Sequence, residues 1–383
     1  MPKEKPPNDI ISFRFKMTTL RTDDLDQILQ DQFTNEFRIG YTKVRGFCLP
    51  TRYEVFADVI ENFEVKNDDI WVCSFPKTGT TWTQEMIWNV ANNLDFEGAK
   101  VHLSERFPFF EYSILFDYLP YTKIHPEVQL PLSTVDSVEY TKNKASPRFI
   151  KTHLPFDLLP RQIRTGEKKP KIIYVARNPK DTCISYFHHC QIIEGYRGNF
   201  SDFLSYTSYW DHVLDFWKKQ TTLNMLLLKY EYMIDLPGAI RKSAAFLDRT
   251  LTDAQVKVLE EHLKFASMKK NPAVNHEDVV RRNKERNKIT VEGSFIRSGK
   301  VAVFFPVRLF DLLKRRDLKE TLHSSIVLLQ SHTEDKSNLF YKCTFIRNKS
   351  TDIYINCTTY ISTFPGSAPF FKRICNISGF LDT

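Results

Sequence analysis

Short apolar runs recur along the chain after Asn67 and alternate with segments of another pattern. Each run is continuous and bounded by charged residues or proline, which is typical of strands buried on both faces. We predict strands in the runs DIWVCSF at 69–75, RFIKTHLP at 148–155, KIIYVAR at 171–177 and NMLLLKY at 224–230.

Segments with helical spacing separate these runs. Residues 82–93 follow the first run, and the segment 178–189 opens with Asn178 as N-cap and Pro179 at the first helical position, a typical helix start. In the segment 201–217, five apolar residues share one predicted helical face: Phe203, Trp210, Val213, Leu214 and Trp217.

The alternation of strands and helices predicts the fold class. Two more helices, near 236–248 and 252–264, complete a pattern typical of an α/β, three-layer fold with a central parallel sheet flanked by helices. Ligands in such folds bind beyond the carboxyl ends of the strands, where the loop at 76–81 lies. By composition we divide the chain into three parts: a polar, loosely ordered N-terminal lead-in at 1–40, the α/β domain at 41–302, and an atypical extension at 303–383. The extension has no clear periodicity, and we interpret it as disordered or as an aberrant end of the gene model, with a genuine appended module as the alternative.

Composition narrows the class of protein. The 383 residues carry a formal net charge of +8, which favours anionic partners such as nucleic acid, a membrane surface or a nucleotide. The chain starts without an apolar signal region and contains no uncharged apolar run of the ~18 residues that a membrane span needs. Seven cysteines without a CxxC pair are typical of reduced cytosolic thiols, so we predict a cytoplasmic protein without a metal or redox centre.

The stretch VCSFPKTGTTWTQEMIW, at 72–88, has the order strand, tight turn, helix that forms an anion site. Backbone N–H groups at the helix start would bind the anion, Thr80 and Thr81 would add hydroxyl donors, and Lys77 a point charge. The lysine precedes the glycine, and no Lys-Ser/Thr pair is present to hold both a γ-phosphate and Mg²⁺. The loop therefore argues against an ATPase or kinase and favours metal-free anion transfer.

FPKTGTTW resembles the 5′-phosphosulfate loop of the cytosolic sulfotransferases, whose donor is 3′-phosphoadenosine 5′-phosphosulfate (PAPS). The resemblance extends over about residues 40–302 and is closest to invertebrate members of the family. Further matching segments follow in the family's order: RFIKTHLP, YVARNPKDTCISYFHH, LLLKYEYM, LKFASMKKNP and FIRSGKV.

The resemblance implies three catalytic roles. Lys77 would donate to the oxygen that bridges phosphate and sulfate and so neutralise the leaving group. His153, in KTHLP, would be the general base that takes the proton of the acceptor hydroxyl or amine. Lys151 would face the sulfonyl oxygens during a direct in-line transfer and would also border the acceptor. Taken alone, each residue has a structural alternative: a turn lysine, a core histidine, or a solvated strand end.

The resemblance also implies a donor site. Thr78, Gly79, Thr80 and Thr81 would hold the 5′-phosphate, with Thr78 where many relatives have serine. Trp82 and Phe265 would cover the two faces of adenine, and Tyr230 would contact it. The adenine-side loop would comprise Leu263, Lys264, Phe265, Ala266, Ser267 and Met268. The 3′-phosphate would be bound by Arg177, Ser185, Arg297, Ser298 and Gly299. Core packing or a solvated basic loop is the structural alternative for these residues.

The segment ERFPFFEY, at 105–112, resembles the family's aromatic acceptor pocket, with Phe107, Phe109 and Phe110 as candidates. It implies a flat, apolar acceptor such as a phenol, a sterol or another small alcohol. Core packing explains each of these residues equally well.

The family pattern breaks near residue 302. The family's signature RKGxxGDWK is RSGKVAVFF here: Ser298 replaces the lysine, Ala302 replaces the second glycine, and Asp-Trp-Lys is absent. The segment that relatives use to form a homodimer is not recognisable. A catalytically impaired, nucleotide-binding relative is therefore the alternative to an active enzyme. A nucleic-acid binder that uses RRNKERNK, at 281–288, is a further alternative, although we interpret that run as a solvated loop.

Overall fold

The computed structural model of the chain describes residues 18–19, 24–200, 202–203, 209–221, 224–287, 293–297, 338–347, 353–362 and 374–377. The chain divides into two compact units. The first comprises residues 1–176 and 184–299, and the second comprises residues 177–183 and 300–383.

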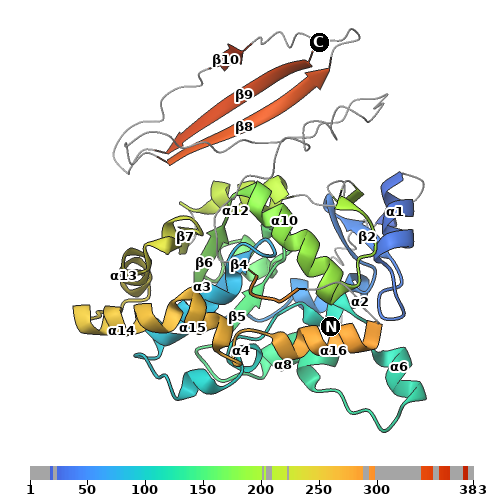
Figure 1. The fold of residues 1–383 in the computed structure, drawn as a ribbon, viewed down its shortest axis with the longest axis horizontal. Helices are drawn as coiled ribbons and strands as arrows, with labels where there is room; N and C mark the ends of the chain where they lie inside the picture. Colours follow the sequence, from blue (N-terminus) through green and yellow to red (C-terminus); the bar gives the residue numbers. More distant parts are fainter. Residues whose placement is uncertain are drawn as a thin grey trace, which may run out of the picture. The chain divides into compact units, whose positions relative to one another are not determined.

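The centre of the first unit is a four-stranded parallel sheet (Figure 1). Its strands are β4 (Ile70–Ser74), β5 (Phe149–Thr152), β6 (Lys171–Ala176) and β7 (Met225–Lys229), and they lie in the order β5-β4-β6-β7. All four predicted strands and the α/β class are thus confirmed. Because β4 has β5 on one side and β6 on the other, the loop after β4 lies at the switch point of the sheet.

Helices and short turns connect the strands. The longer helices are α1 (Asp24–Phe33), α2 (Tyr53–Glu61), α3 (Thr80–Ala91), α10 (Pro179–His189), α12 (Tyr209–Lys219), α13 (Leu236–Phe246), α14 (Asp253–Leu263), α15 (Phe265–Lys270) and α16 (Glu277–Asn287). Short helices are α4 (Leu103–Arg106), α5 (Tyr112–Leu115), α6 (Leu119–Ile124), α7 (Leu132–Val135), α8 (Ser137–Lys142) and α9 (Arg161–Arg164). Single turns of 3-10 helix are η1 (Gly98–Lys100), η2 (Phe156–Leu158) and η4 (Tyr232–Ile234), and η3 (Cys190–Glu194) is a short π-helix.

Local sequence explains where the helices begin. The side chain of Asn178 accepts a hydrogen bond from the Lys180 N–H at 2.9 Å, which confirms the predicted cap of α10. Asp235 caps α13 in the same way through Gly238. Thr252 begins α14 with a capping box, in which its hydroxyl and the Gln255 side chain satisfy each other's backbone N–H groups.

One face of the sheet packs against α3, α13 and α14. The shared core contains large apolar residues from each element, all of them buried: Val72, Ile173, Leu228, Met86, Ile240 and Leu259. Burial of each such side chain contributes about 1.5–3 kcal/mol. This packing holds α3, and therefore the loop that precedes it, against the carboxyl end of β4.

Successive side chains of a strand point to opposite faces of the sheet, so the residues between those of the first core point to the other face. That face is covered by aromatic residues. Tyr174 of β6 stacks on Phe216 of α12 with ring centroids 4.3 Å apart, and its hydroxyl lies 2.9 Å from Nδ1 of His212. Trp71 of β4 packs edge-on against Phe110 at 5.1 Å. Both faces are thus buried, which explains the continuous apolar runs.

The predicted apolar face of 201–217 is only partly right. Phe203 and Val213 are buried, but Trp210, Leu214 and Trp217 are only partly so. The residues of α12 that are buried are Tyr209, His212, Val213 and Phe216. A polar residue, His212, lies on the buried face because both of its ring nitrogens have partners, and this shifts the face away from the one that hydrophobicity alone predicts.

The prediction of a loosely ordered lead-in at 1–40 is wrong for residues 24–40. Helix α1 buries Leu29 and Phe33, and the following segment buries Phe37 and Arg38. A small antiparallel sheet of β1 (Thr18–Thr19), β2 (Tyr41–Val44) and β3 (Phe47–Pro50) continues this layer. The Arg38 guanidinium pairs with Glu194 at 3.0 Å, a contact that the polar composition of the segment does not reveal.

The second unit contains an antiparallel sheet in the order β10-β9-β8. Its strands are β8 (Asn338–Arg347), β9 (Ile353–Ser362) and β10 (Ile374–Ile377). These strands lie in the extension at 303–383, and the interpretation of that extension as atypical stays a prediction. Across both units, the described residues contain no helix long and apolar enough to cross a lipid bilayer.

The buried ion pair of Arg148 with Asp69 gives a test of the fold. Both side chains are almost fully buried, and two guanidinium nitrogens bind the carboxylate at 2.7 Å. Asp69→Ala leaves an uncompensated buried charge, so we expect the free energy of unfolding in urea to fall by about 3–5 kcal/mol. Glu97→Ala breaks the exposed pair with Lys100 and is the control, for which we expect little change. Equal small effects would contradict the role of the buried pair.

Candidate active site

The loop between β4 and α3 has a backbone that its sequence explains. Gly79, the N-cap of α3, has φ of 106°, and a Cβ atom there would lie 2.6 Å from the Tyr230 ring. Glycine is therefore required both by the left-handed conformation and by the close approach of the ring. Lys77 also has a positive φ, 65°, which is uncommon for a residue with a side chain.

The threonines of this loop do not all face outward. The Thr78 hydroxyl is fully buried and lies 2.8 Å from the Phe75 carbonyl and 3.0 Å from the Val175 carbonyl, so it fastens the loop to β6. The Thr80 hydroxyl lies 2.7 Å from that of Ser74. An anion at this position would therefore be bound mainly by the N–H groups of the first turn of α3, with half-buried Thr81 nearby.

The Lys77 ammonium is covered by a segment far away in sequence. It donates to the Phe295 carbonyl at 3.3 Å and lies 3.7 Å from the centre of the Phe295 ring. The backbone N–H of Phe295 in turn donates to Glu277 at the start of α16. The segment 293–297 therefore lies directly over the loop.

His153, just after β5, is held in one tautomer. Its Nδ1 lies 2.7 Å from the Ser74 carbonyl, which can only accept, so Nδ1 carries the hydrogen and Nε2 keeps its lone pair. The backbone carbonyl of His153 accepts from Nε2 of His212 at 3.0 Å. Burial lowers the pKa of His153 well below its usual value, and the charge of Lys151 lowers it further, so the ring is neutral near pH 7.

Glu111 is a buried carboxyl that fixes the end of β5. It accepts from the His153 backbone N–H at 2.6 Å and from the Thr152 hydroxyl at 2.7 Å. Burial raises its pKa to about 7, although these hydrogen bonds act in the opposite direction. Glu111 reaches this place because the Phe110 N–H bonds to the Lys151 carbonyl, which aligns the chain before α5 with β5.

Lys151 lies beside these groups. Its ammonium is 4.0 Å from the centre of the Phe109 ring, and that ring is 5.1 Å from the His153 ring. Burial lowers the pKa of Lys151 to about 8, while the negative charges of Glu111 and Glu194 raise it. Phe109, Lys151 and His153 therefore form one group at the end of β5.

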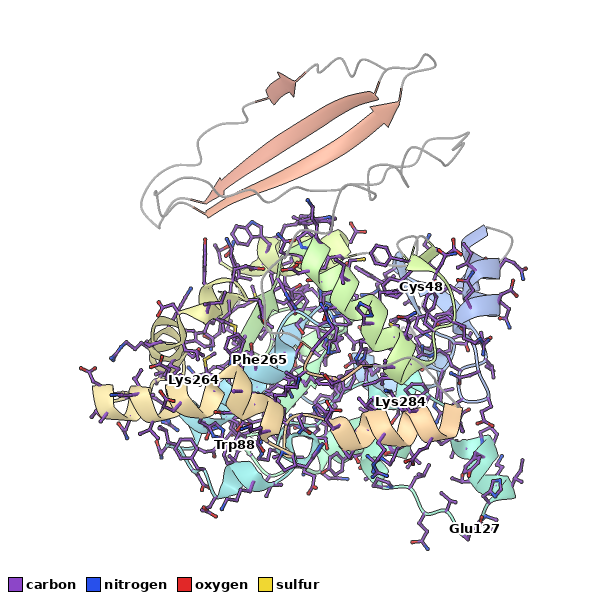
Figure 2. The ribbon with its side chains drawn as sticks, in the orientation of Figure 1. Cys48, Trp88, Glu127, Lys264, Phe265 and Lys284 are labelled. Atoms are coloured by element: carbon purple, nitrogen blue, oxygen red, sulfur yellow. The ribbon has the colours of Figure 1, made fainter. Side chains whose placement is uncertain are left out.

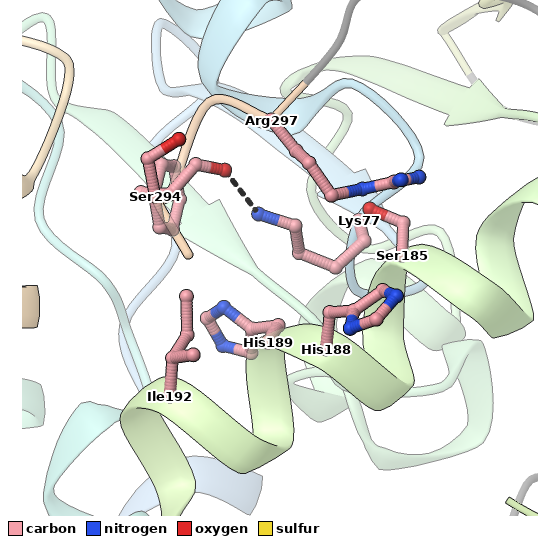
Figure 3. Close-up of a pocket in the computed structure, with 8 residues that line it drawn as sticks. Lys77, Ser185, His188, His189, Ile192, Ser294 and Arg297 are labelled. Atoms are coloured by element: carbon pink, nitrogen blue, oxygen red, sulfur yellow. Dashed lines mark hydrogen bonds between the residues drawn. The ribbon is translucent and has the colours of Figure 1, made fainter. Parts of the chain in front are cut away.

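A pocket opens between α10 and the segment 293–297 (Figure 3). Ser185, His188 and His189 of α10 line it and, at helical spacing, share one face of that helix, and Ile192 lines it from the following η3. The other lining residues are Lys77, Ser294, Phe295 and Arg297. Figure 3 shows Lys77 in the middle, with Ser185, His188 and Arg297 on one side of it.

The predicted adenine-side loop, 263–268, lies at the junction of α14 and α15, where Figure 2 labels Lys264 and Phe265. The Trp82 indole N–H donates to the Leu263 carbonyl at 2.9 Å, and its ring lies 5.6 Å from that of Tyr230. Phe265 is 38% exposed, which is unusual for a large apolar residue and leaves its ring able to contact a ligand. Met268 is buried, the Ser267 hydroxyl bonds to Glu261, and Ala266 is exposed.

Several predicted residues lie elsewhere. Phe107 packs against Phe149, and Phe110 against Trp71, so both are core residues; of the three candidates only Phe109 adjoins Lys151 and His153. Arg177 follows β6 directly, with its guanidinium 3.8 Å from Asp181. Ser298 and Gly299 lie outside the described residues.

The sequence analysis also missed residues of this site. It did not single out Glu111, His212, His188 or His189. The signals were present for two of them, since His188 and His189 lie in the helical register of Ser185. Within the described ranges, no group of His, Cys, Asp and Glu side chains is arranged to hold a metal ion.

The donor set fits an anionic nucleotide. It combines a helix N-terminus behind a glycine where a side chain would be strained, two cations, Lys77 and Arg297, at one pocket, and the exposed ring of Phe265 near the Leu263 carbonyl that Trp82 binds. Hydroxyl, imidazole and guanidinium groups are suitable partners for phosphate oxygens.

Comparisons with known proteins agree with this geometry. The family model of the sulfotransferase domain matches residues 67–304. The luciferin sulfotransferase of Photinus pyralis is 40% identical over 289 residues, which cover 73% of this chain and 78% of that protein. Sulfotransferase 4A1 of Homo sapiens is 34% identical over 239 residues, 59% of this chain and 76% of that protein.

A solved structure is similar over most of the chain. The crystal structure of retinol dehydratase in complex with androsterone and the inactive cofactor PAP covers 80% of this chain and 98% of its own, with a TM-score of 0.67 and 30% identity. The chain therefore belongs to the sulfotransferase domain family. It is a sulfotransferase, and its donor is PAPS.

Glu111 gives a test of the site's electrostatics. Because its folded pKa, about 7, lies above the ordinary value of 4.5, the folded state binds more protons between these values, and stability falls as pH rises through this window. Glu111→Gln keeps acceptor and donor groups for His153 N–H and Thr152 but does not titrate. We therefore expect wild type to lose stability relative to this variant between pH 5 and 8, by up to roughly 3 kcal/mol.

Urea unfolding at several pH values measures this difference. Exposed Glu105→Gln serves as the control and should follow wild type. A constant difference between wild type and Glu111→Gln across the window would show that Glu111 does not titrate there.

Proposed function

We propose that the protein transfers a sulfonate group from PAPS by in-line displacement to a hydroxyl or amine of a small, aromatic or sterol-like acceptor. The observation that carries this proposal is the joint placement of Lys77 and His153 at the adjacent ends of β4 and β5, linked through Ser74. A cation for a leaving group and a neutral base for an attacking hydroxyl are the two groups that such a transfer needs.

The proposed base is His153, through Nε2. The Ser74 carbonyl holds the proton on Nδ1, so the free lone pair of Nε2 is available to accept the acceptor's proton. PAPS supplies an activated sulfonate when bound. Lys77 would leave Phe295 to neutralise the departing phosphate, and Lys151 would stabilise negative charge on the transferred group.

The acceptor class is supported by two observations. Phe109 presents an aromatic face beside His153 and Lys151. Relatives are named for luciferin and retinol, and one related structure contains androsterone. These are small, largely apolar molecules, which an aromatic wall would bind. A cytoplasmic location and a homodimer stay predictions, as does the binding of the 3′-phosphate by Arg177, Ser185, Arg297, Ser298 and Gly299.

The alternative, an impaired nucleotide-binding relative, rests on the altered signature at 297–302. One pair of measurements separates the two: calorimetric titration of the full chain with PAP, the desulfated donor, and transfer of radiolabelled sulfate from PAPS to a panel of phenols, sterols and alcohols. Binding with transfer supports the proposal, and binding without transfer supports the alternative. A folded protein that binds no PAP would reject both.

His153→Ala tests the proposed base. Loss of the proton acceptor should lower kcat by about 10²–10⁴-fold, because general-base catalysis contributes that much. PAP affinity, measured by calorimetry, should change little, since the ring is not a proposed nucleotide ligand. His125→Ala, at an exposed histidine, is the matched control. Equal loss of turnover and of PAP binding would contradict the assignment of His153 as the general base.

Lys77→Ala tests the leaving-group role. An interaction that strengthens in the transition state contributes more to rate than to ground-state binding, so kcat should fall further than donor affinity. Steady-state kinetics with PAPS, together with PAP titration, measure both quantities, and exposed Lys123→Ala is the control. Unchanged turnover would remove Lys77 from this role.

A further inference from the structure

Three polar side chains gather at one end of the pocket between α10 and the segment 293–297. Ser185 and His188 lie three residues apart on the same face of α10, and Arg297 approaches from the opposite wall (Figure 3). The helix fixes the spacing of the first two, because residues at i and i+3 are neighbours on a helical surface. This end of the pocket is defined by Ser185, His188 and Arg297.

The polar groups of these three side chains are available to a ligand. Within the part of the chain that the structure describes, none of them forms a hydrogen bond or an ion pair. Two other lining residues differ: Lys77 is bonded to the Phe295 carbonyl, and His189 lies 3.4 Å from Glu194. A hydroxyl, an imidazole and a guanidinium that converge without partners offer several donors to an external acceptor of hydrogen bonds.

The charge of the pocket determines which kind of hydrogen-bond acceptor would bind there. Burial lowers the pKa of His188, and the positive charge of Arg297 lowers it further. Lys77 and His189 line the same pocket, so every ionisable group facing His188 across it carries or gains positive charge. An anion placed between His188 and Arg297 would relieve their repulsion and favour the protonated imidazole, which then donates a charge-assisted hydrogen bond.

The sequence gives a reason why His188 would be needed. The sulfotransferase signature RKGxxGDWK has a lysine after its arginine, and this chain has Ser298 there. Position 298 therefore carries no permanent charge in this chain, unlike the family signature. His188, one helical turn from Ser185, is placed to supply the missing charge.

We propose that His188 is a direct ligand of the donor's 3′-phosphate, which it binds together with Ser185 and Arg297. The inference rests on the proposed function, because it assumes that the nucleotide occupies this pocket with its 3′-phosphate toward α10. It adds a residue and a charge source to that site, and it makes affinity for the 3′-phosphate depend on the side chain at position 188.

Two nucleotides isolate the effect. PAP and adenosine 5′-phosphate differ in the 3′-phosphate alone, so the ratio of their dissociation constants measures what that group contributes. Calorimetric titration of the full chain should give His188→Phe a PAP affinity about 10-fold to 100-fold below wild type, the loss expected for one charge-assisted hydrogen bond. The affinity for adenosine 5′-phosphate should stay within about twofold.

Replacement by a cation separates binding from packing. His188→Lys should restore PAP affinity to within a few-fold of wild type, because it supplies the charge without the ring. His188→Gln, which keeps polarity without charge, should lie between Phe and Lys and provides a second uncharged variant if the phenylalanine variant does not fold. His125→Phe, at an exposed histidine far along the chain, is the matched control and should behave as wild type.

Any other outcome contradicts the proposal that His188 binds the 3′-phosphate. Equal losses for PAP and adenosine 5′-phosphate, or losses that lysine does not restore, would mean a structural role for His188. Unchanged PAP affinity in the phenylalanine and glutamine variants would exclude contact with the 3′-phosphate. Failure of folded wild-type protein to bind either nucleotide would overturn the proposed function itself, and wild type alone reveals that result.

Discussion

The hydrogen bond from Nδ1 of His153 to the Ser74 carbonyl is the interaction on which the site depends. It joins the carboxyl ends of two strands whose sequence positions are 79 residues apart, and the parallel pairing of Cys73 with Thr152 makes it possible. Through this bond the loop before α3 and the proposed base hold a fixed position relative to each other. The same bond fixes the tautomer of His153, so one interaction sets both the position of the ring and the nitrogen that can accept a proton.

Neighbouring side chains hold the backbone of His153 and so keep this hydrogen bond in place. Glu111 holds the backbone N–H of His153, and His212 holds its carbonyl. His212 is positioned in turn by Tyr174 of the central sheet. Neither supporting residue needs to meet the substrate, because each acts on the backbone that carries the ring. A rigid support of this kind restricts the base to one orientation.

The sequence predicts those parts of the structure that local patterns determine. Strands buried on both faces leave continuous apolar runs, and the loop before α3 has a glycine that its backbone requires, so both were found. Glu111 was not, because its role arises only when the segment before α5 pairs with β5. That pairing also decides that Phe109 faces Lys151 while Phe107 and Phe110 enter the core. A run of phenylalanines cannot reveal such alternation by itself. The burial of Arg38 against Glu194 is another long-range contact of this kind.

The positive charge of the site has two opposing consequences. Lys77 and Lys151 favour an anionic donor, and the proposed base must nevertheless stay unprotonated. Both needs are met because burial, and then the charge of Lys151, lowers the pKa of His153 and keeps its lone pair free. An anion bound among the lysines would cancel part of their effect and raise that pKa again. The ring would then become a stronger base when the donor is in place, so proton transfer would be favoured where it is useful.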